Sequence, residues 1–171
     1  NNIGGILTGA SGGFQEAETS IISQNLGNQN FERALDAFKK TMVISLILGA
    51  IGFVFTGVFM DQIIHSFAKG DLVFATEIRQ IFKYERYAYI TLTVISASMG
   101  FLHAFGYTKL SLAINFMRLF VFRIPTLYFL QKFTHLGSES VGVAMMLSNC
   151  LVGIAALGVC LVVIRKIKKE K

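Results

Sequence analysis

The pattern of hydrophobic and polar positions divides the chain into long apolar stretches separated by polar ones. Three stretches contain no Asp, Glu, Lys or Arg, namely residues 41–60, 87–108 and 140–164, with lengths of 20, 22 and 25 residues. A helix rises about 1.5 Å per residue, so roughly 20 apolar residues match a hydrocarbon core about 30 Å thick. Each stretch therefore predicts a transmembrane helix.

Two further segments have spanning length but carry polar residues. Residues 3–24 are rich in Gly, Ala, Ser and Thr, and residues 110–131 are apolar except for Asn115, Arg118, Arg123 and Pro125. In lipid, backbone polar groups must be satisfied within the segment, which favours helices over strands. We therefore expect an all-α membrane protein. Its single domain is a bundle of about five transmembrane helices, at 3–24, 41–60, 87–106, 110–131 and 140–164.

The connections between these spans are polar. Residues 28–30 predict a turn, and residues 31–40 predict a short amphipathic start to the next helix. In the longest connection, the apolar side chains of residues 73–84 fall near one face, which predicts an interfacial helix. Residues 106–109 and 132–139 predict tight turns.

Charge indicates the orientation of the chain. Charged residues make up 15% of the sequence, against roughly 25% in soluble domains. The net charge is +6, but the basic residues lie between spans and at the C-terminus, which favours a topology signal over nucleic-acid binding. Nine Lys and Arg residues lie on the side of the C-terminus, five lie on the other side and two lie within a span. We expect a multi-pass protein of the cell membrane, with the lipid bilayer as partner and a cytoplasmic C-terminus.

Residue patterns typical of enzymes and metal sites are missing from the sequence. Cys150 and Cys160 lie within the last span, where thiols behave as small apolar side chains, and they indicate neither a disulfide nor a metal site. The His, Asp and Glu residues form no metal-ligand or nucleophile spacing. We expect no enzyme, no metal site and no cofactor other than a coupling ion.

The first predicted helix carries two sets of polar or small residues on different faces. One stripe holds Thr8, Ser11, Gln15 and Glu18, and the other face holds glycines at spacing four together with Glu16. Small residues let helices approach closely, so the glycine face predicts helix packing. The polar stripe is costly against lipid and fits a wet cavity or a polar helix.

Carboxylates within a span are expensive and usually functional. Glu18 is the first candidate for binding or exchanging a cation, and Glu16 is the second. The alternative is that both lie close enough to the helix end to be solvated charges.

The next polar stripe lies in the third predicted helix, at Thr93, Ser96, Gly100 and His103. Such a stripe lines a pathway or holds helices together by hydrogen bonds of roughly 0.6 kcal/mol each. Histidine is the side chain that most readily exchanges a proton under physiological conditions, so His103 is expected either to relay a proton or to serve as a structural donor.

The fourth predicted helix holds two arginines and a proline. Pro125 removes a backbone donor and predicts a kink that exposes carbonyls near residue 121. A guanidinium at this depth needs a carboxylate, backbone carbonyls or a route to the headgroups. We expect a structural partner for Arg123, whereas Asn115 and Arg118 share a face whose role stays open.

Three motifs resemble one transporter family. Residues 22–34, Ile-Ser-Gln-Asn-Leu-Gly-Asn-Gln-Asn-Phe-Glu-Arg-Ala, resemble the Gly-Gln-x-Leu-Gly-Ala-Gly-Asn-x-Glu-Arg-Ala signature of MATE (multidrug and toxin extrusion) transporters. Residues 103–109, His-Ala-Phe-Gly-Tyr-Thr-Lys, are similar to the family's Arg-Gly-x-Gly-x-Thr-Lys turn, with His103 in place of Arg. Residues 122–125, Phe-Arg-Ile-Pro, match a segment of the following helix.

The resemblance implies most of the C-terminal lobe of a twelve-helix transporter, from its eighth to its twelfth helix. The chain starts within Gly-rich apolar sequence without Met, so we expect an upstream part of a longer protein, including an N-terminal lobe as partner. Family members often carry a coupling carboxylate in helix ten, but residues 87–108 contain none. The motif residues with an expected structural role are Gln24, Gly27, Arg33, Gly106, Arg123 and Pro125.

The function implied is secondary active multidrug efflux, in which organic, often cationic, compounds leave by antiport with Na⁺ or H⁺ through alternating access. The residues expected to bind substrate or couple the ion are Glu18, Glu16, Gln15, Ser11, His103, Asn115 and Arg118. The nearest alternative is a lipid-linked oligosaccharide or polysaccharide flippase of the same superfamily, which needs a more basic cavity. A non-transporting interaction subunit is an alternative of a different class.

Overall fold

The fold is a bundle of long helices. The computed structural model describes residues 2–68 and 71–169, and all side chains of this part except those of residues 2–8, 10 and 11. The described residues contain no strand, which confirms the all-α prediction. The helices are α1 (Asn2–Gly27), α2 (Phe31–Val58), α3 (Met60–Ala68), α4 (Leu72–Ala104), α5 (Thr108–Phe116), α6 (Ile124–Phe133) and α7 (Glu139–Lys169), and a π-helical segment, η1 (Met117–Arg123), joins α5 to α6.

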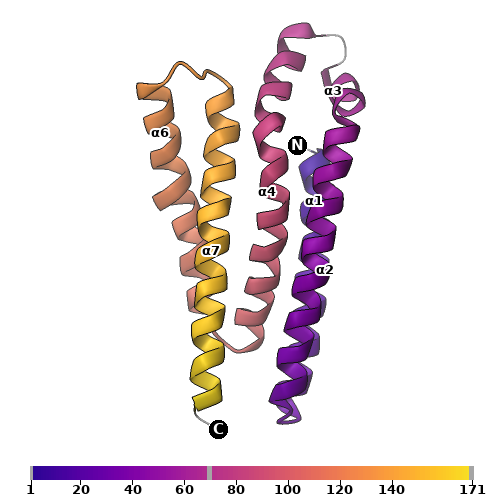
Figure 1. Cartoon of the computed structure of the whole chain (residues 1–171), viewed down its shortest axis with the longest axis vertical. Coiled ribbons are helices and arrows are strands. Elements are labelled where there is room, and N and C mark those ends of the chain that lie inside the picture. The colour runs from indigo at the N-terminus through magenta and orange to yellow at the C-terminus, as the bar shows by residue number, and fades with distance from the viewer. Residues whose placement is uncertain (1, 69–70, 170–171) are drawn as a thin grey trace.

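Helix α4 lies at the centre of the bundle. In Figure 1, α1 and α2 lie on one side of α4, and α7 and α6 lie on the other. The core follows from this arrangement, since the apolar side chains of α4 pack against those of α7 and α1. Its fully buried members include Ile22 of α1, Phe101 and Leu102 of α4, and Val152 and Ala156 of α7.

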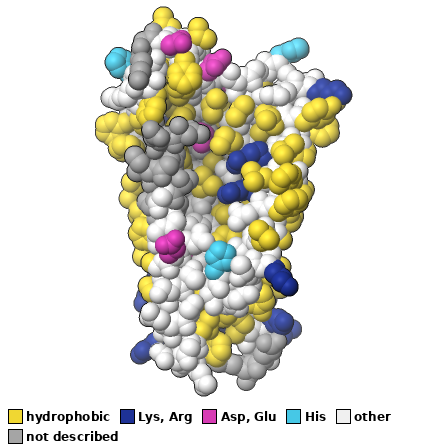
Figure 2. Space-filling view, turned by 180° about the vertical axis from the view of Figure 1, so that it is seen from behind, with side chains coloured by type: hydrophobic (Ala, Val, Ile, Leu, Met, Phe, Trp, Pro, Cys, Tyr) yellow, Lys and Arg dark blue, Asp and Glu magenta, His cyan; other side chains and the backbone are white. Residues whose placement is uncertain are grey.

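Four helical segments are long and apolar enough to cross a membrane. They are Phe31–Val58, Leu72–Ala104, Thr108–Phe133 and Glu139–Lys169. Helix α2 turns most of its apolar surface outward, since only 22% of its most apolar 18-residue stretch is buried. Figure 2 shows hydrophobic side chains over much of one face of the molecule. Such a surface suits lipid as solvent. Four of the five predicted spans are therefore supported. Helix α1 has 26 residues but does not belong to this group, so its crossing of the membrane stays a prediction.

The prediction of an interfacial helix at residues 73–84 is wrong. This segment is the first part of α4, which runs without a break for 33 residues. Asp71 starts the helix, since its Oδ1 accepts hydrogen bonds from the backbone N–H groups of Val73 and Phe74. Val73 and Phe74 at its start are exposed, whereas Ile81 further along lies against Gly142 of α7. The segment is helical, as the pattern indicates, but it is part of a helix of the bundle and not a separate interfacial helix.

Arg86 shows why charges in the lower-numbered half of α4 do not interrupt the helix. Its guanidinium carbon lies 5.2 Å from the ring centre of Phe53 and 5.1 Å from that of Tyr87. The contact with Phe53 holds α4 against α2, and the one with Tyr87 lies within α4. The predicted connection is also shortened by α3, a helix that the sequence analysis did not predict.

The other predicted turns are confirmed. Residues 28–30 form a turn after α1, and Asn30 caps α2 through its Oδ1, which accepts from the backbone N–H of Arg33. Gly106 has a φ of +78° in the turn between α4 and α5, a conformation that favours glycine. In Figure 1 these two turns lie at the same end of the bundle as the C-terminus. The count of Lys and Arg residues also assigns these two turns and the C-terminus to the same side.

Pro125 acts through η1. Pro has no backbone N–H, and in a regular α-helix its ring clashes with the carbonyl four residues earlier. Directly before Pro125 the helix widens, and the backbone N–H of Ile124 donates to the carbonyl of Leu119, five residues back. The predicted distortion near residue 121 therefore takes the form of a π-helical segment.

Helices α4 and α7 approach closely at Gly142. A Cβ atom added there would lie 2.5 Å from the carbonyl oxygen of Ile81. Backbone atoms move little, so only glycine permits this distance.

We expect Gly142→Ala to lower the apparent melting temperature of the detergent-solubilised protein, because the added methyl group overpacks the α4–α7 contact by about 1–3 kcal/mol. Gly158→Ala is the matched control, since a Cβ atom there meets nothing within 4 Å. Equal melting temperatures for the two variants, measured by thermal denaturation, would contradict the close contact.

Candidate functional site

The most unusual buried group of the chain is the carboxyl group of Glu18. Its side chain is 2% exposed. Neither carboxyl oxygen has a hydrogen-bond partner among the described residues. A buried polar group without a partner costs free energy, and native structures contain few of them. Such a group marks a candidate site for a ligand that would satisfy it.

The position of Glu18 depends on a glycine of α4. A Cβ atom added to Gly100 would lie 2.5 Å from Oε2 of Glu18 and 3.1 Å from the backbone oxygen of Gln15. Thr19 supports the same contact, because its Oγ1 donates to the backbone oxygens of Gln15 and Gly100 at 2.7 and 3.2 Å. The small residue at 100 therefore brings α1 against α4 and lets the carboxyl group enter the bundle.

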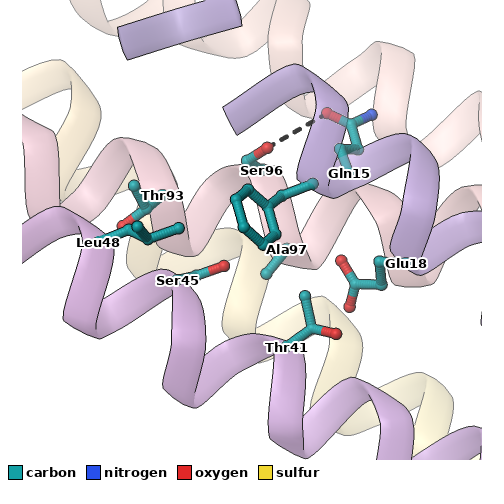
Figure 3. Close-up of a pocket in the computed structure, with 9 residues that line it drawn as sticks. Gln15, Glu18, Thr41, Ser45, Leu48, Thr93, Ser96 and Ala97 are labelled. Atoms are coloured by element: carbon teal, nitrogen blue, oxygen red, sulfur yellow. Dashed lines mark hydrogen bonds between the residues drawn. The ribbon is translucent and has the colours of Figure 1, made fainter. Parts of the chain in front are cut away.

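Beside Glu18 lies a small polar cavity between α1, α2 and α4. Its volume is about 10 Å³, which is room for about one water molecule. Figure 3 shows the side chains of all three helices converging on it. The polar ones are Gln15 and Glu18 of α1, Thr41 and Ser45 of α2, and Thr93 and Ser96 of α4.

The cavity offers several oxygen acceptors. Thr41 donates its hydroxyl proton to the carbonyl of Ala37 at 3.0 Å, and Thr93 donates to the carbonyl of Ile90 at 2.9 Å. Both hydroxyl oxygens keep lone pairs, as does the carboxyl group of Glu18. A cluster of oxygen acceptors around a space of this size suits a small dehydrated cation or a proton carried by Glu18.

Gln15 joins the cavity to His103. Its Oε1 accepts from the hydroxyl of Ser96 at 3.5 Å, the interaction dashed in Figure 3, and its Nε2 lies 3.3 Å from Nδ1 of His103. The amide thus bridges two positions of the polar stripe predicted on the third span. Gln15 also lines a second cavity of about 200 Å³, whose wall includes Asn115 and Arg118.

Arg123 lies in a separate polar cluster. Its Nε donates to Oγ of Ser148 at 3.4 Å, and its Nη2 donates to Oδ1 of Asn149 at 3.3 Å. Glu85 of α4 lies close enough to interact with Arg123 electrostatically. The two hydrogen bonds tie η1 to α7, and the charge of Glu85 on α4 attracts Arg123. Arg123 therefore has structural partners.

Glu85 is not among the predicted site residues, because the predicted third span starts at residue 87. Residues 87–108 contain no carboxylate, but the observed α4 begins earlier, at Leu72, and includes Glu85. The signal was available in the helical period: Ala88, Tyr89 and Ile95 are buried on α4, and position 85 continues that face.

The family model MatE matches residues 1–129. The chain belongs to the MatE family. The fold agrees with solved MATE structures. One is described as the inward-facing conformation of a multidrug resistance MATE family transporter of the MOP superfamily, with a TM-score of 0.85, 18% identity and coverage of 91% of this chain. Another is described as MATE in complex with MaL6, with a TM-score of 0.84, 18% identity and coverage of 90%.

The chain spans 36% and 34% of the length of these two MATE structures. It therefore corresponds to about a third of such a transporter. A comparison with curated protein sequences gives no significant match.

The residues of the MATE signature lie around the turn after α1. Gln24 is exposed, and its Nε2 donates to Oγ of Ser20 at 3.5 Å. Gly27 is the last residue of α1, and Arg33 is exposed on the first turn of α2. None of the three contacts the Glu18 cavity, so their positions agree with a role in the turn.

The two acidic candidates of α1 have different environments. Glu16 is exposed, whereas Glu18 is buried. Ser11 lies on the described backbone of α1, but its side chain is outside the described residues. The structure thus brings together Glu18 and Gln15, places His103 beside Gln15, and leaves Glu16 apart.

We expect Gly100→Ala to lower the apparent melting temperature by an amount corresponding to about 1–3 kcal/mol, because the added methyl group collides with the Glu18 carboxyl group. The double variant Gly100→Ala with Glu18→Ala should regain part of the loss, since it removes the colliding atoms. Gly13→Ala is the control, since a Cβ atom there meets nothing within 4 Å. If the loss of stability in the double variant, measured by thermal denaturation, equals the sum of the losses in the two single variants, the contact between Gly100 and Glu18 is contradicted.

Proposed function

We propose that this chain is part of a MATE-type secondary active transporter that exports organic, often cationic, compounds in exchange for Na⁺ or H⁺. The observation that carries the proposal is the buried, unpartnered carboxyl group of Glu18 beside a cavity of about 10 Å³. A coupling ion needs a site that is small, dry and rich in oxygen acceptors. Family membership supports the transport class.

Occupancy of this site would act on the contacts between three helices. A cation or proton at Glu18 neutralises a charge that α1, α2 and α4 otherwise enclose. Loss of the ion leaves a bare carboxylate, which favours an arrangement that admits water. An ion and a substrate that prefer opposite-facing states are thereby coupled. The rest of the transporter, which we propose is an N-terminal lobe, would supply the other wall of the pathway.

The alternative is a lipid-linked oligosaccharide or polysaccharide flippase of the same superfamily. The observation in its favour is Arg118, which lines the cavity of about 200 Å³ and gives it a basic wall. The size and oxygen content of the Glu18 cavity favour ion-coupled export over this alternative.

We further propose that the C-terminal end of the bundle faces the cytoplasm of a cell membrane. The turn before Phe31 and the turn at Gly106 lie at this end (Figure 1). The end carries more Lys and Arg than the opposite one, and the positive-inside rule supports the assignment.

We expect Glu18→Gln to remove the ion dependence of drug efflux by the full-length protein, because the amide carries no charge to exchange. We expect ion-driven uptake to fall by about tenfold or more. The loss of one charge-assisted contact costs about 1.4 kcal/mol or more, which corresponds to a factor of ten. The measurement is uptake of a cationic dye into proteoliposomes under an imposed Na⁺ or H⁺ gradient.

Glu16→Gln is the matched control for Glu18→Gln, because it removes an exposed carboxylate two residues away on the same helix. It should leave efflux and ion dependence unchanged. Unchanged ion dependence in Glu18→Gln would exclude Glu18 from coupling. Absence of dye efflux combined with movement of a labelled lipid-linked sugar would favour the flippase.

Orientation is tested by single cysteines introduced into the full-length protein after all its native cysteines, Cys150 and Cys160 included, have been replaced. A cysteine in place of exposed Lys169 should react with a membrane-impermeant maleimide only after the cells are opened. A cysteine in place of Glu139, at the opposite end of α7, should react in intact cells. The reverse pattern would contradict the cytoplasmic C-terminus.

A further inference from the structure

A second polar site lies on the other side of Gln15 from the Glu18 cavity. It is a cavity of about 200 Å³ between α1, α4 and the α5–η1 segment, and its polar lining consists of Gln15, Ser96, Asn115 and Arg118. Gly12 of α1 also lines it. Gln15 and Ser96 line both cavities, so the two sites share a wall.

The positive charge of Arg118 is not balanced within the described residues. Its Nε atom is buried and has no hydrogen-bond partner there. The ion pairs within 4.0 Å in this part of the chain, Lys40–Asp36 and Arg79–Asp61, do not involve it. The neighbouring charge that acts on Arg118 is that of Arg123, which repels it.

The other polar groups of the cavity add hydrogen-bonding capacity. Nδ2 of Asn115 lies 3.9 Å from the sulfur of Met99, which is a weak acceptor. This amide therefore keeps donor capacity for a stronger acceptor. A guanidinium beside an amide donor is a typical arrangement for carboxylate or phosphate oxygens, which accept charge-assisted hydrogen bonds.

The size of the cavity limits what it can hold. Sites for drug-sized ligands occupy about 300–1,000 Å³, whereas this cavity of about 200 Å³ matches one polar group of a larger molecule. The unbalanced positive charge also disfavours the cationic group of a substrate. The volume is compatible with one polar group, and the positive charge makes an anionic group the better match.

We propose that the Arg118 cavity binds an oxyanion, that is, the carboxylate or phosphate group of a transported molecule or of a lipid headgroup. This inference rests on the proposed transport function, because it assigns the chemistry of one group of the ligand. Glu18 on one side of Gln15 and Arg118 on the other would then hold a small cation and an anionic group at neighbouring positions.

The test is equilibrium binding to the purified full-length protein in detergent. The free-anion probes are inorganic phosphate and acetate, and the lipid probe is a short-chain phosphatidic acid, with its neutral diacylglycerol counterpart as control. Binding of phosphate and acetate is read from the shift in apparent melting temperature at constant ionic strength. Binding of the lipid is counted by native mass spectrometry.

Arg118→Gln should weaken binding of the effective probe by about tenfold or more, the effect of losing a charge-assisted contact. Arg118→Lys keeps the charge but not the guanidinium fork, and it should weaken binding less. Arg165→Gln, which removes an exposed arginine near the end of α7, is the control and should change nothing. Glu18→Gln should leave anion binding intact, which separates this test from that of ion coupling.

A measurement on the unmodified protein covers the case in which Arg118→Gln fails to fold. Phenylglyoxal reacts with free guanidinium groups, and the effective probe should slow its reaction at Arg118 but not at Arg165. Protection by phosphate or acetate assigns a free anionic substrate group, and protection by phosphatidic acid alone assigns a lipid headgroup.

The inference is overturned by any of three results. They are the absence of saturable binding by every probe, unchanged binding in Arg118→Gln, and equal protection of Arg118 and Arg165. Each can occur while ion-dependent efflux and its loss in Glu18→Gln persist, so failure here leaves the proposed transport function standing.

Discussion

The close approach of α1 to α4 at Gly100 determines the candidate site. Without a Cβ atom at this position, the backbone of α4 leaves room for the carboxyl group of Glu18, which a methyl group would displace. Glycine normally weakens a helix by about 1 kcal/mol relative to alanine, and here that cost accompanies a buried carboxyl group that also costs free energy. Two unfavourable features at one contact indicate a site shaped for a ligand rather than for stability.

The two arginines of the fourth span illustrate the same distinction. Arg123 donates to Ser148 and Asn149 of α7, and the charge of Glu85 on α4 attracts it. Arg118, one helical turn earlier, lines a cavity and keeps a buried nitrogen without a partner. In a medium of low dielectric constant, partnered groups stabilise the bundle, whereas a buried polar atom without a partner costs free energy. Arg118 differs from Arg123 in this respect and in lining a cavity.

The π-helical segment η1 relates these two arginines to each other. It begins at Met117 and ends at Arg123, directly before Pro125. Because each turn of a π-helix holds more residues than an α-helical turn, side chains after it are rotated relative to those before it. Arg118 and Arg123 both lie within η1, five residues apart, so its wider turns bring the two side chains closer in direction than a regular α-helix would. They differ in their partners, because Arg123 reaches Ser148 and Asn149 of α7, whereas Arg118 lines the cavity beside α1.

Much of the fold could be predicted from the sequence. The lengths of the apolar stretches, the turn at residues 28–30, glycine at position 106 and the distortion before Pro125 follow from local backbone chemistry and from helix length. The family resemblance of three short motifs agrees with the family to which the chain belongs. The wrong prediction of an interfacial helix at residues 73–84 has a physical cause. An amphipathic helix has the same sequence pattern whether its apolar face meets the membrane surface or neighbouring helices.

The sequence by itself determined that the chain forms long apolar helices and that Glu18, Gln15, Asn115 and Arg118 lie in polar stripes upon them. Only the tertiary structure decided which of these residues share a cavity, that Glu16 is exposed while Glu18 is buried, and that Glu85 belongs near Arg123. The reason is that helical periodicity defines the face of a helix but not the partner of that face. The partner depends on contacts such as Gly100 with Glu18, which join residues 82 positions apart in the chain.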